Sequence, residues 1–260
     1  MALAPLRRVV RVAPIAPDLV GRALLGRLAR RIAGRSIDTA TGPGINTRAT
    51  IDADPRATVA ALLPGITVDQ LDAYEREYLA VDHDLIQRAG SRELPMPSIW
   101  RTEHGTGLAL YTLARALGPE VVVETGIANG WSSVIFLRAL QQNGRGRLHS
   151  FDVRDDVGRL VDPAERERWQ LHLLRPATLG AFDRTIAGLD PIGLFFHDSD
   201  HSYLHMRLEL RMAGARLAPG GALCSDDVSL SHAYVEACEE LGVMPRLLVD
   251  GHKASGFAVR

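Results

Sequence analysis

The chain has 260 residues, of which 46% are hydrophobic and 23% are charged, and its formal net charge is −1. This length suits one large α/β domain with an accessory segment, and it is ample for a sizeable core. The near-neutral balance argues against bulk nucleic-acid binding, which needs a basic face, so no nucleic-acid partner is expected.

The first 35 residues carry eight arginines against one acid, Asp18. Apolar residues over 18–33 roughly follow helical spacing, which predicts a packing helix with solvated arginines. The alternative is a basic amphipathic helix in weak contact with an anionic membrane surface. Residues 36–57, rich in Thr, Gly, Asp and Pro, are expected to form a loop or linker.

Helical spacing continues from Thr67, a plausible N-cap, to about Ala89, and Pro95 and Pro97 stop it. We expect residues 67–97 to cover the ligand crevice, with Tyr74, Tyr78 and Trp100 facing the acceptor or the core. The basic arm and this helical cap together make a predicted accessory region, residues 1–95.

From Glu103 onwards, helices alternate with short apolar strands. The predicted helices are 108–117, 132–142, 179–187, 204–217 and 232–241, and the predicted strands are 120–124, 147–152, 170–174, 193–197 and 222–225. A hairpin, 246–249 and 256–259, closes the chain around Asp250-Gly251. Alternation of this kind predicts an α/β fold with a Rossmann-like, doubly wound sheet of seven strands, one of them antiparallel, over residues 96–260.

No run of about 18 apolar residues occurs, so no transmembrane helix is expected. The two cysteines, Cys224 and Cys238, form no C-x-x-C pair, which argues against a disulfide scaffold or a thiolate zinc site. A cytoplasmic location is the expectation.

A glycine-rich turn follows the apolar strand Val121–Val123. It runs from Glu124 through Gly126 and Gly130 to a helix that opens near Ser132. Glycines here let a ligand approach the backbone, and the helix N-terminus offers free N–H groups to an anion. The G-x-G-x-x-G fingerprint of dinucleotide binding is missing, which counts against an NAD(P)-dependent oxidoreductase.

This E-x-G-x-x-x-G pattern resembles motif I of class I methyltransferases, which use S-adenosylmethionine (SAM). The next strand ends at Asp152, an acid placed as in nucleotide-binding α/β folds. The resemblance implies that Gly126 and Gly130 cradle the methionine part of SAM. It also implies that Glu124 holds the methionine ammonium group, Ser132 the carboxylate and Asp152 the ribose.

Acidic residues follow two further strands: Asp198 and Asp200 come after one, and Asp226 and Asp227 after the other. Ligands in an open parallel sheet bind beyond the carboxyl ends of the strands, so both groups should face the crevice of the glycine-rich turn. Crowded carboxylates repel one another, and a bound cation relieves this. Oxygen ligands without a thiolate favour a hard ion: Mg²⁺, with Mn²⁺ or Ca²⁺ as alternatives.

The D-x-D-H-S-Y stretch at 198–203, the P-G-G turn at 219–221 and the Asp226-Asp227 pair resemble the metal-dependent sugar O-methyltransferases of the macrocin and mycinamicin type. The rhamnosyl O-methyltransferases and the cephalosporin hydroxylase group share the pattern, and the catechol O-methyltransferases share it more distantly. The resemblance covers roughly residues 96–260. It implies that Asp198, Asp226 and Asp227 bind the metal and that His201 is the general base.

These expectations describe a SAM-dependent, divalent-metal-dependent O-methyltransferase that acts on a hydroxyl of a saccharide, within a glycoside, a polysaccharide or a glycosylated natural product. The alternatives are a catechol-type phenolic acceptor, hydroxylase-like chemistry on the same fold, and a SAM-binding module without catalysis. The resemblance also suggests a homo-oligomer.

Overall fold

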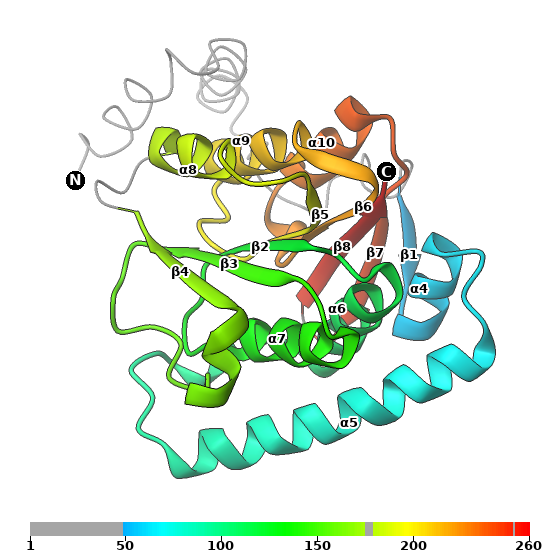
Figure 1. Cartoon of the computed structure of the whole chain (residues 1–260). Helices are drawn as coiled ribbons and strands as arrows, with labels where there is room; N and C mark the ends of the chain where they lie inside the picture. The colour runs from blue at the N-terminus through cyan, green and yellow to red at the C-terminus, as the bar shows by residue number, and fades with distance from the viewer. Residues whose placement is uncertain (1–48, 175–178, 252) are drawn as a thin grey trace.

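The computed structural model describes residues 49–174, 179–251 and 253–260, and its centre is an eight-stranded sheet (Figure 1). The strand order is β1-β7-β8-β6-β5-β2-β3-β4, and neighbours are parallel except that β8 is antiparallel to β6 and β7. The strands are β1 (Thr50–Asp52), β2 (Val121–Thr125), β3 (Arg147–Asp152), β4 (Trp169–Leu173), β5 (Ile192–His197), β6 (Leu217–Ser225), β7 (Arg246–Asp250) and β8 (Lys253–Val259). The predicted doubly wound α/β fold is confirmed.

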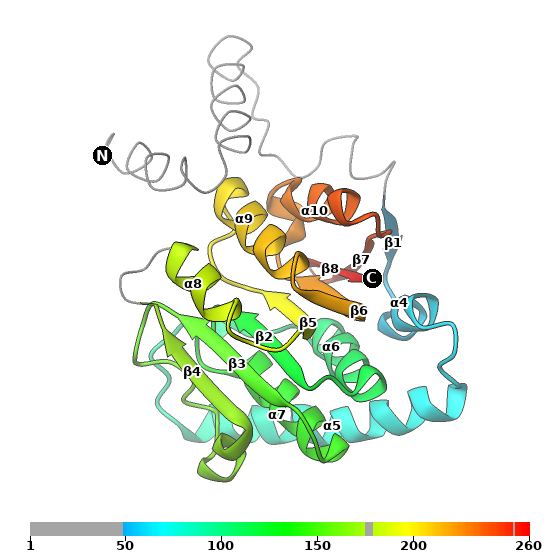
Figure 2. The same cartoon turned by 45° about the horizontal axis from the view of Figure 1, so that its top comes forward.

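Helices cover both faces of the sheet (Figure 2). On one face lie α4 (Pro55–Leu62), α5 (Val68–Ser91), α6 (His104–Leu117) and α7 (Trp131–Asn143); on the other lie α8 (Leu179–Ile186), α9 (Tyr203–Gly214) and α10 (Ala233–Leu241). Short 3₁₀ turns are η1 (Ser98–Trp100), η2 (Pro163–Arg168) and η3 (Val228–Leu230). The helix spacing read from the sequence is therefore confirmed from Thr67 onwards.

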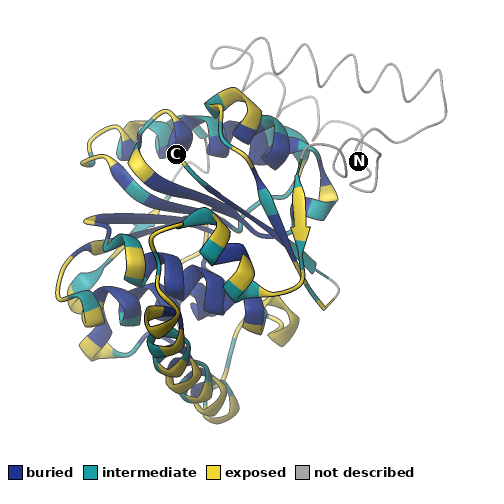
Figure 3. Cartoon of the chain, turned by 90° about the vertical axis from the view of Figure 1, so that its right-hand side faces the viewer, coloured by how far each residue is buried: buried dark blue, intermediate teal, exposed yellow. Residues whose placement is uncertain are grey.

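The central strands β2 and β5 are mostly apolar, and they are buried on both faces of the sheet (Figure 3). Val122 and Phe196 pack in the core beneath α6 and α7, whereas Val123 and Phe195 pack in the core beneath α8, α9 and α10. Neighbouring residues of one strand thus belong to different cores, as the two-residue period of a strand requires.

The predicted strand count of seven is wrong by one, because β1 lies at the sheet edge beside β7 within the segment expected to be a linker. The helix α4 follows it directly: the Asp54 side chain accepts a hydrogen bond from the Arg56 N–H, and Pro55 occupies the first turn. A three-residue strand and an eight-residue helix are too short to give a clear periodic signal.

The helix α5 begins as predicted, with Thr67 and Gln70 forming a reciprocal capping box. It packs against α6 and α7 (Figure 1), so it lies on the helical face and not over the carboxyl edge of the sheet. Of the segment 67–97 that was expected to cover the crevice, the helix itself thus packs on α6 and α7, and only Met96, beyond its end, contacts the glycine-rich turn. Tyr78 is fully buried against α6, and the Tyr74 ring lies under the Arg115 guanidinium.

The expected basic N-terminal helix and most of the expected linker lie outside the described residues. Within the described part of the chain, no helix is long and apolar enough to cross a membrane.

Candidate active site

The carboxyl ends of β2, β5 and β6 are held side by side by hydrogen bonds that continue past the strands. The Asp198 N–H donates to the Thr125 carbonyl at 2.8 Å, and the Asp226 N–H donates to the His197 carbonyl at 2.8 Å. The connections after β2 and β5 run to opposite faces of the sheet, through α7 and α9. This is the switch point at which open α/β sheets bind ligands.

Gly126 and Gly130 have positive φ angles of 80° and 94°. A Cβ on Gly126 would lie 2.0 Å from the Asp198 carbonyl oxygen, and one on Gly130 would lie 2.9 Å from the Gly158 Cα. Both glycines are therefore required by the close approach of other backbone segments, in addition to any ligand. They join the glycine-rich turn to the acidic loop that follows β5.

Glu124 is fully buried, and its carboxylate accepts hydrogen bonds from three serine hydroxyls, those of Ser132, Ser133 and Ser150. Burial raises the pKa of Glu124, and the three hydroxyls act in the opposite direction. The Ser132 hydroxyl, expected to hold the carboxylate of SAM, donates to Glu124 in this structure. Both side chains thus support the turn from beneath in this structure.

Asp152 lies at the end of β3, half-buried beside the glycine-rich turn. Its carboxylate accepts backbone hydrogen bonds from Ile127 at 2.9 Å, Val153 at 2.7 Å and Arg154 at 2.9 Å. A carboxylate has about four acceptor positions, so one remains for a further donor such as a ribose hydroxyl. Asp152 therefore fixes the turn and still offers an acceptor.

His201 lies between two of the predicted metal ligands. Its Nε2 is 3.6 Å from Oδ1 of Asp198 and 3.6 Å from Oδ2 of Asp227. The imidazole is about 20% exposed, and each carboxylate is about 25% exposed. The structure thus brings together three of the four residues that were predicted to bind the metal or to act as the general base, and all three are partly exposed to solvent.

The fourth residue, Asp226, is turned to other partners. Its Oδ1 accepts the Ser255 hydroxyl at 2.8 Å, and its Oδ2 lies 3.4 Å from the Lys253 ammonium nitrogen. Lys253 Nζ is also 3.1 Å from Oε2 of Glu103. Sequence reasoning missed Lys253, Glu103 and Ser255 because they come from distant segments and belong to no recognisable motif.

The electrostatics of this cluster follow from burial and crowding. Burial, followed by the negative charge of Asp226, raises the pKa of Asp198 well above its ordinary value. Burial and the neighbouring His197 lower the pKa of His201 to about 4. His201 is therefore neutral at pH 7 and can accept a proton.

The donor set has the chemistry of a hard-cation site, because its oxygens carry more negative charge than Lys253 offsets. Asp198 receives no side-chain hydrogen bond from the described residues, and burial followed by the charge of Asp226 raises its pKa. In the present side-chain arrangement, no group of three His, Cys, Asp or Glu residues is placed to hold a metal ion within residues 49–174, 179–251 and 253–260. A cation would need Asp226 to turn from Lys253.

A buried network beneath His201 was also missed. Glu209, on α9, lies 2.8 Å from Nδ1 of His197 and 2.9 Å from Nε2 of His205, and it accepts hydroxyl hydrogen bonds from Thr125 and Ser199. Burial acts to raise the pKa of Glu209, but His205 and His197 hold it well below its ordinary value. A glutamate within an amphipathic helix gives no sign of this role.

Residues 96–103 reach the glycine-rich turn, although α5 does not. Met96 and Asn129 exchange two hydrogen bonds, Met96 N–H to Asn129 Oδ1 at 3.2 Å and Asn129 Nδ2 to the Met96 carbonyl at 3.0 Å. Met96 also packs with Ile127 and Val157. Trp100, in the same segment, is 57% exposed. Of the three aromatic residues that were expected to face the acceptor or the core, Trp100 is thus the most exposed.

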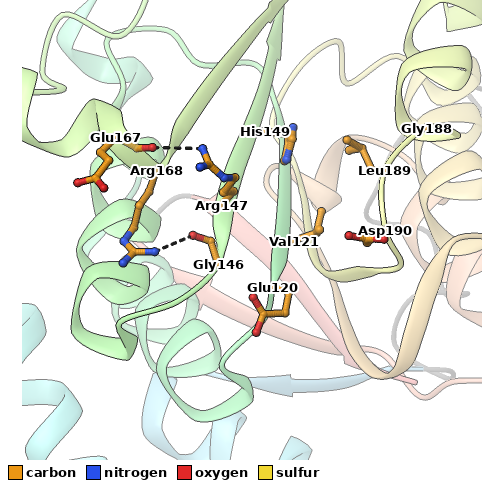
Figure 4. Close-up of a pocket in the computed structure, with 10 residues that line it drawn as sticks. All are labelled: Glu120, Val121, Gly146, Arg147, His149, Glu167, Arg168, Gly188, Leu189 and Asp190. Atoms are coloured by element: carbon orange, nitrogen blue, oxygen red, sulfur yellow. Dashed lines mark hydrogen bonds between the residues drawn. The ribbon is translucent and has the colours of Figure 1, made fainter.

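A separate cavity of about 480 Å³ lies at the opposite, amino edge of the sheet (Figure 4). Arg147, His149 and Asp190 are among the side chains that line it. Because ligands of this fold bind at the carboxyl edge, this cavity is not part of the candidate active site.

Comparison with known proteins supports the assignment of class. Residues 123–228 match a family model described as a methyltransferase domain, a span that contains every residue from Glu124 to Asp227 discussed above. A comparison with curated protein sequences gives no match.

Two solved structures have the same fold. An O-methyltransferase from Bacillus cereus in complex with SAH is 15% identical, with a TM-score of 0.50 over 79% of this chain and 96% of that chain. A methyltransferase from Geobacter sulfurreducens is 21% identical, with a TM-score of 0.51 over 78% of this chain and 93% of that chain. The match over residues 123–228 confirms the expected methyltransferase domain, and the two solved structures share its Rossmann-like fold.

Proposed function

We propose that this chain transfers the methyl group of SAM to a hydroxyl oxygen of a saccharide, within a glycoside, a polysaccharide or a glycosylated natural product, with the help of a divalent cation. The observation that carries the proposal is the position of His201, whose Nε2 lies 3.6 Å from both Asp198 and Asp227 beside the glycine-rich turn. A neutral imidazole in an acidic, partly exposed site suits the removal of a proton from an alcohol.

SAM is expected at the switch point, over the turn that carries Gly126 and Gly130. The first N–H groups of α7 have no side-chain cap, because Gly130 is the N-cap, so they can bind the methionine carboxylate. Asp152 offers its remaining acceptor position to the ribose. We place Glu124 and Ser132 beneath the ligand, as the support that keeps this turn in shape.

The reaction then needs one proton transfer and one displacement. His201 accepts the hydroxyl proton on Nε2, the oxygen forms a bond to the methyl carbon, and the carbon–sulfur bond breaks to leave SAH. Holding the three atoms in line contributes much of the rate. A divalent ion held by Asp198, Asp226 and Asp227 would supply Lewis-acid activation, lowering the pKa of the acceptor hydroxyl, and Mg²⁺ with Mn²⁺ as the alternative fits these oxygen donors.

The proposal of a saccharide acceptor is supported by the side chains around the site. They are carboxylates, an imidazole and an ammonium, with Trp100 as an exposed aromatic in the segment above the turn. Polar groups of this kind bind neighbouring hydroxyls, and an exposed indole can pack against a sugar ring. A pocket for a flat phenol would instead be lined mostly by apolar side chains.

The test is methyl transfer from labelled SAM to panels of glycosides, oligosaccharides and catechols, with Mg²⁺, with Mn²⁺ and after EDTA treatment. We expect a methyl ether on a sugar hydroxyl, dependent on the added ion, and no product with catechols. Transfer to catechols alone would refute the acceptor class. Full activity after EDTA treatment would refute the metal dependence and leave the methyl transfer standing. The same experiments at several protein concentrations, with mass measurement in solution, test the expected homo-oligomer.

A further inference from the structure

Lys253 is the only lysine in the chain; the other 29 basic residues of the 30 Lys and Arg are arginines. It is the first residue of β8, and its side chain is only 13% exposed. The ammonium lies between two carboxylates, 3.1 Å from Glu103 and 3.4 Å from Asp226. The one lysine of this arginine-rich chain thus lies in the group of carboxylates formed by Glu103, Asp198, Asp226 and Asp227, which we call the acidic cluster.

Lysine and arginine differ in a way that matters here. The ammonium is a compact point charge on a flexible stem, whereas guanidinium is a wide planar fork that fixes two hydrogen bonds at once. Lys253 also lies 3.4 Å from the Arg101 carbonyl. The compact ammonium of Lys253 fits between Asp226, Glu103 and this carbonyl. If it moves away from Asp226, it can still be paired with the carboxylate of Glu103.

Both carboxylate oxygens of Asp226 contact side chains of β8. Ser255 donates to one of its oxygens, and Lys253 lies on the other. Asp198 and Asp227 face His201 instead. The third carboxylate of the expected metal site is therefore bound to a cation that belongs to the chain itself.

We propose that Lys253 is the resident counter-cation of the acidic cluster and competes with a divalent ion for Asp226, so that it sets the metal affinity of the site. The inference rests on the proposed metal site and specifies how that site is regulated. When a divalent ion binds Asp226, the ammonium stays paired with Glu103, 3.1 Å away. Lys253 is thus a positioning residue, and Glu103 is the partner that lets it move.

The experiment is calorimetric titration of Mg²⁺ into the full-length protein and its Lys253 variants, in the absence of SAM. Lys253→Met removes the competing charge and keeps the apolar stem, so we expect Mg²⁺ to bind about tenfold more tightly or better. Lys253→Arg keeps the charge but replaces the compact ammonium with a planar fork that holds Asp226 more firmly, so we expect Mg²⁺ to bind more weakly than to the unaltered protein.

Glu103→Gln tests the same idea with the opposite sign. It removes the second partner, which leaves the ammonium more firmly on Asp226, so Mg²⁺ should bind about threefold more weakly or worse. Thermal unfolding with and without Mg²⁺ reports whether each variant is folded, since an ion that binds the native state raises the Tm.

Unchanged or weaker Mg²⁺ binding in Lys253→Met, with a folded protein, would overturn the inference. If neither the unaltered protein nor any variant bound Mg²⁺, both the proposed competition and the proposed metal dependence would be refuted. A parallel SAM titration separates these outcomes from the proposed function, because loss of SAM binding alone would refute methyl transfer and leave the competition intact.

Discussion

Glu209 and His197 form a buried pair, with Oε2 of Glu209 2.8 Å from Nδ1 of His197, and neither side chain is more than 2% exposed. The His197 ring in turn meets the His201 ring edge-on, with 5.4 Å between the centroids. The glutamate therefore orients the imidazole against which the candidate base packs, although it lies on a different element from all the predicted site residues.

Replacing Glu209 with Gln should lower turnover about tenfold and leave the KM for SAM nearly unchanged. The amide keeps the shape but loses the negative charge to which His197 and His205 are paired, so the His201 ring loses its fixed support. Steady-state kinetics with each substrate varied will separate the two parameters. A rise in the KM for SAM with unchanged kcat would show that the network supports cofactor binding instead.

Replacing His201 with Ala should reduce turnover by about 10²–10⁴-fold while SAM binding is kept, because a positioned base contributes an acceleration of that size. Calorimetric SAM titration and a single-turnover assay measure the two effects. The matched control is His83→Ala, which removes an exposed histidine on α5 and should leave both unchanged. Activity of His201→Ala within threefold of the unaltered protein would remove His201 from the mechanism.

Gly126→Ala should destabilise the protein by on the order of 3 kcal/mol, because the new Cβ would lie 2.0 Å from the Asp198 carbonyl oxygen at a φ of 80°. Gly144→Ala is a matched control, since Gly144 also has a positive φ, 69°, but no atom lies within 4 Å of its added Cβ. That variant should lose about 1 kcal/mol. Urea denaturation followed by circular dichroism gives both values, and equal losses would contradict the role assigned to the Asp198 backbone.

Acid should weaken the fold through His172. Burial, with a smaller contribution from His149, lowers the pKa of His172 to about 4, compared with about 6.5 in an unfolded chain. The unfolded state therefore binds a proton first as the pH falls, so this contribution to stability is complete above pH 6.5 and is lost between about pH 6.5 and 4.

His172→Asn should flatten that part of the pH profile. Urea denaturation at intervals from pH 7 to 4 will show the difference in slope between the variant and the unaltered protein. His83→Asn is the control, because His83 is exposed on α5. An identical pH dependence for His172→Asn and the unaltered protein would show that His172 titrates normally.

The main elements of the fold could be predicted from the sequence, because the alternation of apolar strands with amphipathic helices is long and regular from Thr67 onwards. The strand β3 was predicted with the bounds that the structure gives, Arg147–Asp152. The strand β1 could not be predicted, since its three residues are partly exposed and their pairing with β7 depends on tertiary contact alone. The placement of α5 failed for a similar reason: amphipathicity reports that a helix has an apolar face, and not which surface receives it.

The site could be predicted where its functional residues come directly after the ends of strands. Asp198, His201 and Asp227 come together because β5 and β6 are neighbours and parallel, which the alternating pattern implies. The interactions of Asp226 with Lys253 and of Glu124 with three serines could not be read in this way. They depend on side-chain directions set by packing between segments far apart in the sequence.

The pairing of β1 with β7 also constrains how the protein folds during synthesis. Thr50 aligns with Arg246, and Arg246 donates a hydrogen bond to the Asp52 side chain at 2.7 Å. During synthesis, β1 therefore cannot pair with β7 until nearly two hundred further residues have been made. Contacts of such long range form slowly. We expect the β2–β6 region to become compact first, and β1 to complete the sheet after the C-terminal hairpin has emerged.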